Sequence, residues 1–341
     1  MLSSSVTKAM VPEMSQNESD ILIVSDDICK DVISRRDAFD AVESVFSAMA
    51  KKEARNFPVI RESLGYQDAL YGFKSGFDKA GLSLGVKSGG YWPNNSKRGL
   101  TNHQSTVFLF DPDTGRLEAL VGGNYLTAVR TAAASAVSIA HLAKKEAKVL
   151  GIVGAGHQAS FQLEAALEQR SFEKVVVWNK DKTKLARLEK ITVDNGLVFE
   201  SLEREALCSE ADVIITITSA HEALLMREWI KPGTHIACMG TDTKGKQEID
   251  PLLMISATLF TDELAQSTTI GELQHAVAND LMVDTDITPI GDVINCDHPG
   301  RTSNNEITLF DGTGVGLQDL AVASTAMKLA KQQGIAQRVS L

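Results

Sequence analysis

The sequence has few cysteines, and their spacing matches no common disulfide or metal-binding pattern. The chain contains four, namely Cys29, Cys208, Cys238 and Cys296, and no two of them form a C-x-x-C pair. Zinc sites and redox motifs need cysteines at close, regular spacing. We therefore expect reduced thiols in a cytoplasmic protein that holds no metal ion.

Long apolar runs and clusters of basic residues are missing as well. No apolar stretch reaches the length of a membrane span, and residues 1–17 lack the apolar core of a signal peptide, which favours a disordered tail. The chain has 34 Lys and Arg against 44 Asp and Glu, a net charge of −10, without a basic run that would attract nucleic acid or anionic lipid. We expect neither a nucleic acid nor a membrane as a partner.

A dinucleotide-binding pattern is present in residues 148–187. The apolar run Val149–Val153 leads into a G-x-G-x-x-A segment, Gly154–Ala159, and a second apolar run, Val175–Trp178, follows an amphipathic stretch. Such a strand, turn, helix and strand unit brings the backbone close to a pyrophosphate at the helix N-terminus. We expect cofactor contacts from Gly154, Gly156, His157 and Gln158.

The pattern continues downstream as alternating strands and helices. Short apolar runs recur at Val213–Ile217, His235–Met239 and Leu259–Thr261, between helix-like segments such as Leu264–Ala278. This alternation is typical of parallel sheets covered by helices. The sequence predicts an α/β fold in which residues 127–315 form a Rossmann-type doubly wound parallel sheet.

The region before residue 127 follows a different pattern. After an amphipathic helix that begins near Ser34, short strands are separated by Gly, Asn and Pro, with a hairpin turn at Asp111–Gly115. The segment from Leu317 to Gln333 predicts one more helix, long enough to return to this region. We expect residues 18–126 and 316–341 to form a discontinuous α+β domain for substrate binding and dimerisation.

Seven short motifs extend over nearly the whole chain: Arg55, Gly85-Val86-Lys87, Asn102 to Thr106, Arg130 to Ala133, the glycine-rich segment, Gly240-Thr241-Asp242 with Gly245-Lys246, and Phe310-Asp311 with Gln318-Asp319-Leu320. In this order and spacing they resemble the ornithine cyclodeaminase and mu-crystallin family, which includes ketimine reductases and archaeal-type alanine dehydrogenases. The resemblance implies an NAD(H)- or NADP(H)-dependent enzyme that acts on a small amino or imino acid. We expect a homodimer in which the β-rich first domain pairs with a copy of itself.

The resemblance also implies roles for three charged residues. Arg55 matches the arginine that grips the substrate carboxylate, and a guanidinium suits a bidentate hold on such a group. Lys87 matches the active-site lysine, and its small, apolar surroundings would lower its pKa toward that of a proton donor. Asp242 matches a catalytic aspartate of the cyclodeaminases that mu-crystallin lacks, which favours an enzyme over a binding protein.

The remaining cofactor contacts implied by the resemblance are Asn102, His103, Arg130, Thr218, Lys246 and Thr313. The choice between NAD and NADP depends on the end of the second strand, where an acidic residue would bind the ribose hydroxyls of NAD. Here Asn179 and Lys180 favour a 2′-phosphate, whereas the following Asp181 disfavours it. The sequence leaves the two cofactors open.

Lys74 departs from the family pattern, because relatives usually have a short apolar segment there. A third cation near Arg55 and Lys87 would suit a substrate with a second carboxylate, such as the imine of oxaloacetate. If Lys74 instead points outward, it has no part in substrate binding. We expect an imine reductase that forms an L-α-amino acid. The alternatives are an ornithine cyclodeaminase and a non-catalytic protein that binds NADPH and a small ligand.

Overall fold

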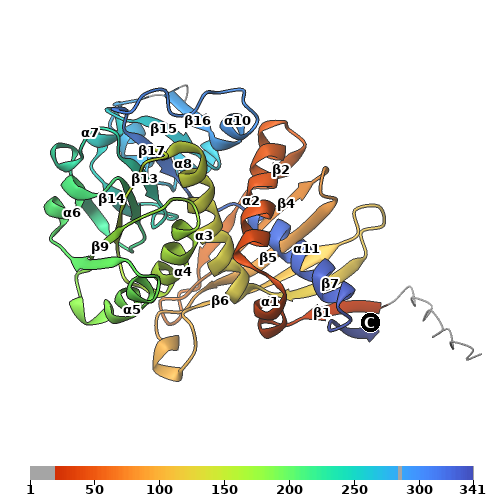
Figure 1. Cartoon of the computed structure of the whole chain (residues 1–341). Helices are drawn as coiled ribbons and strands as arrows, with labels where there is room; N and C mark the ends of the chain where they lie inside the picture. Colours follow the sequence, from red (N-terminus) through yellow and green to blue (C-terminus); the bar gives the residue numbers. More distant parts are fainter. Residues whose placement is uncertain (1–19, 283–285, 341) are drawn as a thin grey trace, which may run out of the picture.

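Two sheets and the helices between them make up the structure, a computed structural model that describes residues 20–282 and 286–340 (Figure 1). The tail expected at residues 1–17 lies outside the described residues. The first sheet contains β1 (Asp20–Val24), β2 (Ala54–Asn56), β3 (Ile60–Ser63), β4 (Leu70–Asp78), β5 (Ser83–Tyr91), β6 (His103–Phe110), β7 (Leu117–Gly122) and β18 (Gln337–Ser340). Its order is β18-β1-β7-β6-β5-β4-β2, with β3 also paired to β4, and only the β1–β7 pair is parallel.

The second sheet is parallel throughout, as expected for a doubly wound fold. It contains β8 (Val149–Val153), β9 (Lys174–Trp178), β10 (Val198–Ser201), β11 (Val213–Thr216), β13 (His235–Cys238), β15 (Thr258–Thr261), β16 (Ile287–Pro289) and β17 (Thr308–Asp311). The order is β10-β9-β8-β11-β13-β17-β15-β16. From β8 the chain adds β9 and β10 on one side, and it then returns to add β11 on the other side of β8. Ligands of doubly wound sheets bind outside the strand ends at the point where the order of strands reverses in this way. A small third sheet pairs β12 (His221–Leu225) with β14 (Gln247–Ile249).

Helices cover both faces of the parallel sheet, which explains its continuous apolar strands. Val213 and Ile215 pack into one core, and Ile214 between them packs into another on the opposite face. The helices are α1 (Asp26–Val32), α2 (Arg35–Ala50), α3 (Gly123–Leu142), α4 (His157–Leu167), α5 (Ala186–Asp194), α6 (Arg204–Glu210), α7 (Pro251–Met254), α8 (Leu264–Ser267), α9 (Gln274–Ala278), α10 (Ile290–Ile294) and α11 (Gly316–Gln332). None of these described helices combines the length and the hydropathy needed to cross a bilayer.

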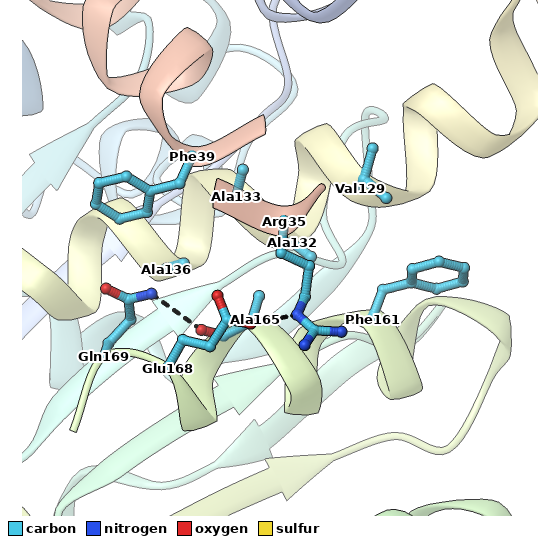
Figure 2. A pocket seen from close by; sticks show the side chains of 10 residues that line it. All are labelled: Arg35, Phe39, Val129, Ala132, Ala133, Ala136, Phe161, Ala165, Glu168 and Gln169. Atoms are coloured by element: carbon cyan, nitrogen blue, oxygen red, sulfur yellow. Dashed lines mark hydrogen bonds and ion pairs between the residues drawn. The ribbon is translucent and has the colours of Figure 1, made fainter. Parts of the chain in front are cut away.

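Helix α3 joins the two halves of the molecule. It contacts β6 of the first sheet and β13 and β17 of the second, and it packs against α2 and α4. A crevice of about 20 Å³ lies where these three helices meet. Figure 2 shows the side chains that line it, among them Ala132, Ala133 and Ala136 of α3. Arg35 of α2 reaches across it to Glu168 at the end of α4. Small side chains on α3 therefore let helices from both halves approach closely, as its composition indicates.

The local signals of the sequence agree with the structure except at one helix. Ser34 begins α2 with a capping box, in which Asp37 accepts from its backbone N–H. The helix expected at Leu264–Ala278 is instead split into α8 and α9 by a turn. A Cβ at Gly271, inside that turn, would lie 2.4 Å from a carboxylate oxygen of Asp311. The prediction of one helix was wrong because the buried strand end of β17 approaches the chain at this position.

The path of the C-terminal segment supports the expected domain division. Helix α11 packs against β4, β5 and β6, and β18 pairs antiparallel with β1. The chain thus enters the first sheet, passes through the second and returns to the first. The division into residues 18–126 with 316–341 and residues 127–315 stays a prediction, which this path favours.

Candidate active site

A cleft of about 1600 Å³ lies between the two sheets, at the carboxyl ends of the parallel strands. One wall comes from β3, β4, β5 and β6, with α3 behind them. The other wall consists of the segments that follow β8, β9, β11, β13 and β17. The cleft therefore coincides with the strand ends at which a doubly wound sheet binds its ligand.

The glycine-rich turn after β8 has the geometry of a dinucleotide cradle. Gly154 has a φ of +115°, and a Cβ there would lie 2.6 Å from the carbonyl oxygen of Ile217. Gly156 is the N-cap of α4, and a Cβ there would meet no atom within 4 Å and would project into the cleft. Gln158 also lines the cleft, and its buried Oε1 has no hydrogen-bond partner among the described residues. The turn at Gly154 and the open space at Gly156 fit a pyrophosphate at the N-terminus of α4, whereas the Oε1 of Gln158 can accept only from a donor group such as a hydroxyl.

The end of β9 bears on the choice between NAD and NADP. The Oδ1 of Asn179 accepts from the backbone of Ala155 at 2.9 Å, so this neutral side chain braces the glycine-rich turn. Lys180 is exposed at the cleft edge. The carboxylate of Asp181 accepts from the backbone and hydroxyl of Thr183 instead of facing the cleft. No described carboxylate of this loop lines the cleft, so Asp181 is not placed to repel a 2′-phosphate.

A buried triad of charges forms the deepest part of the first wall. Lys87 of β5 and Arg130 of α3 lie 2.7 and 2.8 Å from the two carboxylate oxygens of Asp319 on α11. Burial lowers the pKa of Lys87 to about 7, although Asp319 opposes this shift. Burial acts to raise the pKa of Asp319, but Arg130 and Lys87 hold it at about 2. One carboxylate thus serves two cations, which leaves this wall positive and Lys87 able to gain or lose a proton near pH 7.

Lys74 points into the cleft. It pairs across the strands with Lys87, and cross-strand partners face the same side of a sheet. Its ammonium donates to the carbonyl oxygen of Gly314 at 2.6 Å. Burial lowers its pKa to about 8, and Arg130 adds to this effect. The outward orientation considered from the sequence is therefore excluded.

Asp242 is an ionised member of an ion-pair network across the cleft mouth. Its carboxylate lies 2.8 Å from Lys246 and 3.1 Å from Arg61 of β3. Burial acts to raise the pKa of Asp242, but Lys246, Arg61 and Lys74 hold it well below its usual range. At neutral pH this group is a charge and a hydrogen-bond acceptor rather than an acid.

The structure does not bring Arg55 to the cleft. Arg55 pairs with Phe77 of β4, whereas Arg61 pairs with Gly72. Residues 72 and 74 share one face of the strand and residue 77 lies on the other, because side chains alternate along a strand. Arg55 is exposed on the opposite face from Lys74, and Arg61 occupies the wall in its place. The structure therefore does not place Arg55 where it could bind a substrate in the cleft, and Arg61 is the arginine that lines this wall.

The other expected cofactor contacts all line the cleft, and their roles stay predictions. Asn102 accepts from the backbone of Ser96, and His103 has a pKa lowered to about 3 by burial and by the charge of Lys87, so its imidazole is neutral. Thr218 follows β11, Lys246 donates to Asp242, and the ring of His157 lies 5.4 Å from that of Phe161 at a tilt of 59°. Thr313 donates to Asp262 through its backbone and its hydroxyl.

The partners of these residues are not apparent from the sequence. Asp319 lies within a motif of the resemblance that implies no role for it, and Arg61 and Asp262 lie outside those motifs. A buried acid between two buried cations is visible only when α3, β5 and α11 are brought together. Among residues 20–282 and 286–340, no group of three or more His, Cys, Asp or Glu side chains could hold a metal ion.

The comparisons with known proteins agree with this geometry. The model of the ornithine cyclodeaminase/mu-crystallin family matches residues 22–333. The iminosuccinate reductase of Paracoccus denitrificans is 56% identical over 321 residues, which are 94% of this chain and 100% of that protein. Its crystal structure in complex with NAD⁺ has a TM-score of 0.91 to this chain.

Two further solved structures share the fold. An archaeal alanine dehydrogenase dimer with bound NAD has a TM-score of 0.89 at 29% identity, covering 94% of this chain and 99% of its own. The Δ1-pyrroline-2-carboxylate reductase of Thermococcus litoralis, in complex with NADH and L-proline, has a TM-score of 0.89 at 26% identity, covering 94% and 100%. The expected α/β fold class is confirmed, and the chain belongs to the ornithine cyclodeaminase/mu-crystallin family.

Proposed function

We propose that this chain is an NAD(P)H-dependent imine reductase that forms an L-α-amino acid, with iminosuccinate as substrate and L-aspartate as product. The observation that carries the proposal is the cluster of Arg61, Lys74 and Lys87 on one face of the first sheet, opposite the dinucleotide cradle. Three cations in a partly desolvated wall suit a substrate with two carboxylates. The 56% identity to an iminosuccinate reductase supports the same substrate.

In this proposal the cations of the first wall bind and orient the substrate. The guanidinium of Arg61 holds one carboxylate in a bidentate fork, and the ammonium of Lys74 holds the other. Arg130 and Asp319 keep Lys87 in place, and Lys87 supplies the proton that the imine nitrogen needs. The reduced nicotinamide, when bound, supplies a hydride to the α-carbon of the imine.

Asp242 takes a different part from the one expected for a proton donor. With its pKa held below the usual range, it carries no proton at neutral pH. It instead orients Lys246 and Arg61 through hydrogen bonds of 2.8 and 3.1 Å. We assign the proton to Lys87, whose pKa of about 7 matches the task.

The charge of the cleft argues against both alternatives. The δ-ammonium of ornithine would enter a wall that already presents Arg61 and Lys74, and like charges in a desolvated site disfavour the wrong ligand. A non-catalytic binding protein has no need of a buried lysine whose pKa lies near 7. Ammonia release without net NADH formation would identify a cyclodeaminase.

The test compares 2-oxo acids that form imines with ammonia. Oxaloacetate and pyruvate, each with ammonia and either NADH or NADPH, should differ at least tenfold in kcat/KM in favour of oxaloacetate. Lys74→Met should lower kcat/KM for oxaloacetate by about 1.5–3 kcal/mol, or roughly 10- to 150-fold, the range of a charged hydrogen bond. Its activity on the imine of pyruvate should change less than twofold.

This comparison contains its own control, because Arg61, Lys87 and the cofactor serve both substrates. Equal losses on both imines would make Lys74 a structural residue and would end the assignment of iminosuccinate. The NADH and NADPH arms also decide the cofactor preference. The neutral Asn179 and the displaced Asp181 carboxylate support use of both.

We further propose a homodimer formed through the outer face of the first sheet. This face carries Phe73, Leu84, Val86 and Phe108, which are half-buried or exposed in the single chain. Apolar side chains on an uncovered sheet face commonly mark an interface. Light scattering of the purified protein tests this assignment. A cytoplasmic location stays a proposal, supported by the free thiols of all four cysteines.

A further inference from the structure

Two fully buried glutamates lie behind the wall of the cleft that receives the cofactor. Glu248 is on β14, and Glu272 is in the turn before α9; both have no solvent-exposed surface. Among the described residues, no lysine or arginine forms an ion pair with either carboxyl group. Buried carboxylates without a cation are costly, so this pair needs an explanation in terms of its partners.

Glu248 ties together the ends of two parallel strands. Its Oε1 accepts from the backbone N–H of Thr218 at 2.6 Å. Its Oε2 accepts from the hydroxyl of Thr216 at 2.7 Å and from the backbone N–H of Gly240 at 3.0 Å. The approach is so close that a Cβ at Gly240 would lie 2.5 Å from both oxygens. Thr218 and Gly240 line the cleft, so Glu248 sets the shape of its floor.

Glu272 holds both ends of the loop that carries Asp242 and Lys246. Its Oε1 accepts from the backbone N–H groups of Glu248 and Ile249, each at 2.7 Å. Its Oε2 lies 2.5 Å from the hydroxyl of Thr241. The loop from Thr241 to Glu248 therefore begins and ends on the same carboxyl group.

The surroundings favour one proton on this pair at neutral pH. Burial and the neighbouring Glu248 raise the pKa of Glu272 to about 8, and burial also raises the pKa of Glu248. The titratable groups facing the pair from packed elements are Cys238 on β13 and Asp311 on β17, with Asp242, Lys246 and His275 beyond the loop. Oε1 of Glu272 accepts two backbone N–H groups, whereas Oε2 accepts only from the hydroxyl of Thr241, so the remaining lone pair of Oε2 is the position for the proton.

We infer that Glu248 and Glu272 are positioning residues with one proton between them, carried by Glu272, and that this proton keeps the nicotinamide side of the cleft and the Asp242–Lys246 loop in the arrangement that binds the cofactor. A second negative charge would face Glu248 without a counter-ion and would loosen the loop. The folded chain holds the proton between pH 4.5 and about 8, where the unfolded chain has lost it, so rising pH in this window disfavours the folded arrangement.

The experiment measures NADH affinity by fluorescence at pH 6, 7 and 9 in the full chain. Glu272→Gln preserves the shape of the residue, since its oxygen can accept both N–H groups and its amide can donate to Thr241, but it cannot ionise. Between pH 7 and pH 9 the NADH affinity of both proteins is compared. The affinity of the unaltered protein should fall by a factor at least three times larger than the factor by which that of the variant falls. At pH 6 the two proteins should agree within twofold. The ratio of the two NADH affinities at each pH reports the ionisation of Glu272 alone, because Lys74, Lys87 and Asp311 titrate in both proteins and their effects cancel.

Glu248→Gln cannot preserve the hydrogen bonds in this way, because both oxygens of Glu248 accept from backbone N–H groups. The amide nitrogen of the glutamine would place a donor against the N–H donor of either Thr218 or Gly240. It should weaken NADH binding at least tenfold at every pH. Glu306→Gln is the matched control, because its carboxylate also accepts from backbone N–H groups and a threonine hydroxyl but lies outside the cleft lining. This control should leave NADH affinity and its pH dependence unchanged.

Two results would overturn the inference: a Glu272→Gln variant that keeps the pH dependence of the unaltered protein, or a tenfold loss of its NADH affinity at pH 6. If Glu248→Gln does not fold, the Glu272→Gln titration alone decides. The inference rests on the proposed function only for its relevance to imine reduction. NADH binding that follows the expected pattern in a protein that reduces no imine would reject the proposed function and leave the inference standing.

Discussion

The two walls of the cleft use buried charge in opposite ways. The wall from the first sheet presents the cations Arg61, Lys74 and Lys87. Behind them the single carboxylate of Asp319 is shared by Lys87 and Arg130. The wall from the parallel sheet presents glycines, backbone groups and the paired Asp242 and Lys246, and its buried glutamates have no cation partner among the described residues. Burial lowers the pKa of Lys87 to about 7 and raises that of Glu272 to about 8.

The difference follows from what each wall must bind. A substrate with carboxylates needs localised positive charge, which a protein supplies with partly paired cations. A cofactor pyrophosphate is bound by N–H groups at a helix N-terminus, and a free carboxylate nearby would repel it. Because Glu272 keeps its proton, it can brace this wall without adding a second negative charge to that of Glu248.

The largest effect should come from removing the shared anion of the cationic wall. Asp319→Asn leaves Lys87 and Arg130 buried with no counter-ion, and breaking such a pair costs about 3–5 kcal/mol. Urea unfolding should show this loss. Without Asp319 the pKa of Lys87 should fall below about 7, so activity that needs its proton should disappear at lower pH than in the unaltered enzyme. An unchanged pH profile would show that Lys87 does not supply the proton.

A smaller effect should separate the two arginines of the first sheet. Arg61→Lys should raise KM for the imino acid roughly 10- to 150-fold, because an ammonium cannot reproduce two parallel hydrogen bonds. Arg55→Lys, on the opposite face of the same sheet, is the matched control and should leave KM unchanged. A loss that follows Arg55 instead would return the carboxylate contact to that residue and would contradict the cationic wall described here.

The smallest of these effects should appear on the parallel-sheet wall. Gly156→Val should weaken NADH binding about tenfold, since the side chain would project into the space where the backbone meets the pyrophosphate. The fold should survive, because a Cβ there meets no atom within 4 Å. Equal NADH affinity in the folded variant, measured by fluorescence titration, would remove this turn from the cofactor site.

Local signals in the sequence were enough for most of the fold. The apolar runs of the parallel sheet, the capping residues Ser34 and Asp37, and the glycine-rich turn each depend on neighbours within a few residues. Such patterns report the local backbone directly. The single helix expected at Leu264–Ala278 was wrong because a distant strand end, at Asp311, limits the space at Gly271.

The fold class and the dinucleotide turn followed from the sequence alone, because both depend on local patterns of apolar residues and glycines. Only the tertiary structure decided which arginine faces the cleft, because Arg55 and Arg61 lie in one short segment and their orientation depends on the register with β4. It also decided that Asp242 is ionised and that Lys87 has a pKa near 7. Side-chain orientation and proton affinity depend on burial and on charges from distant parts of the chain, which come together only in the folded protein.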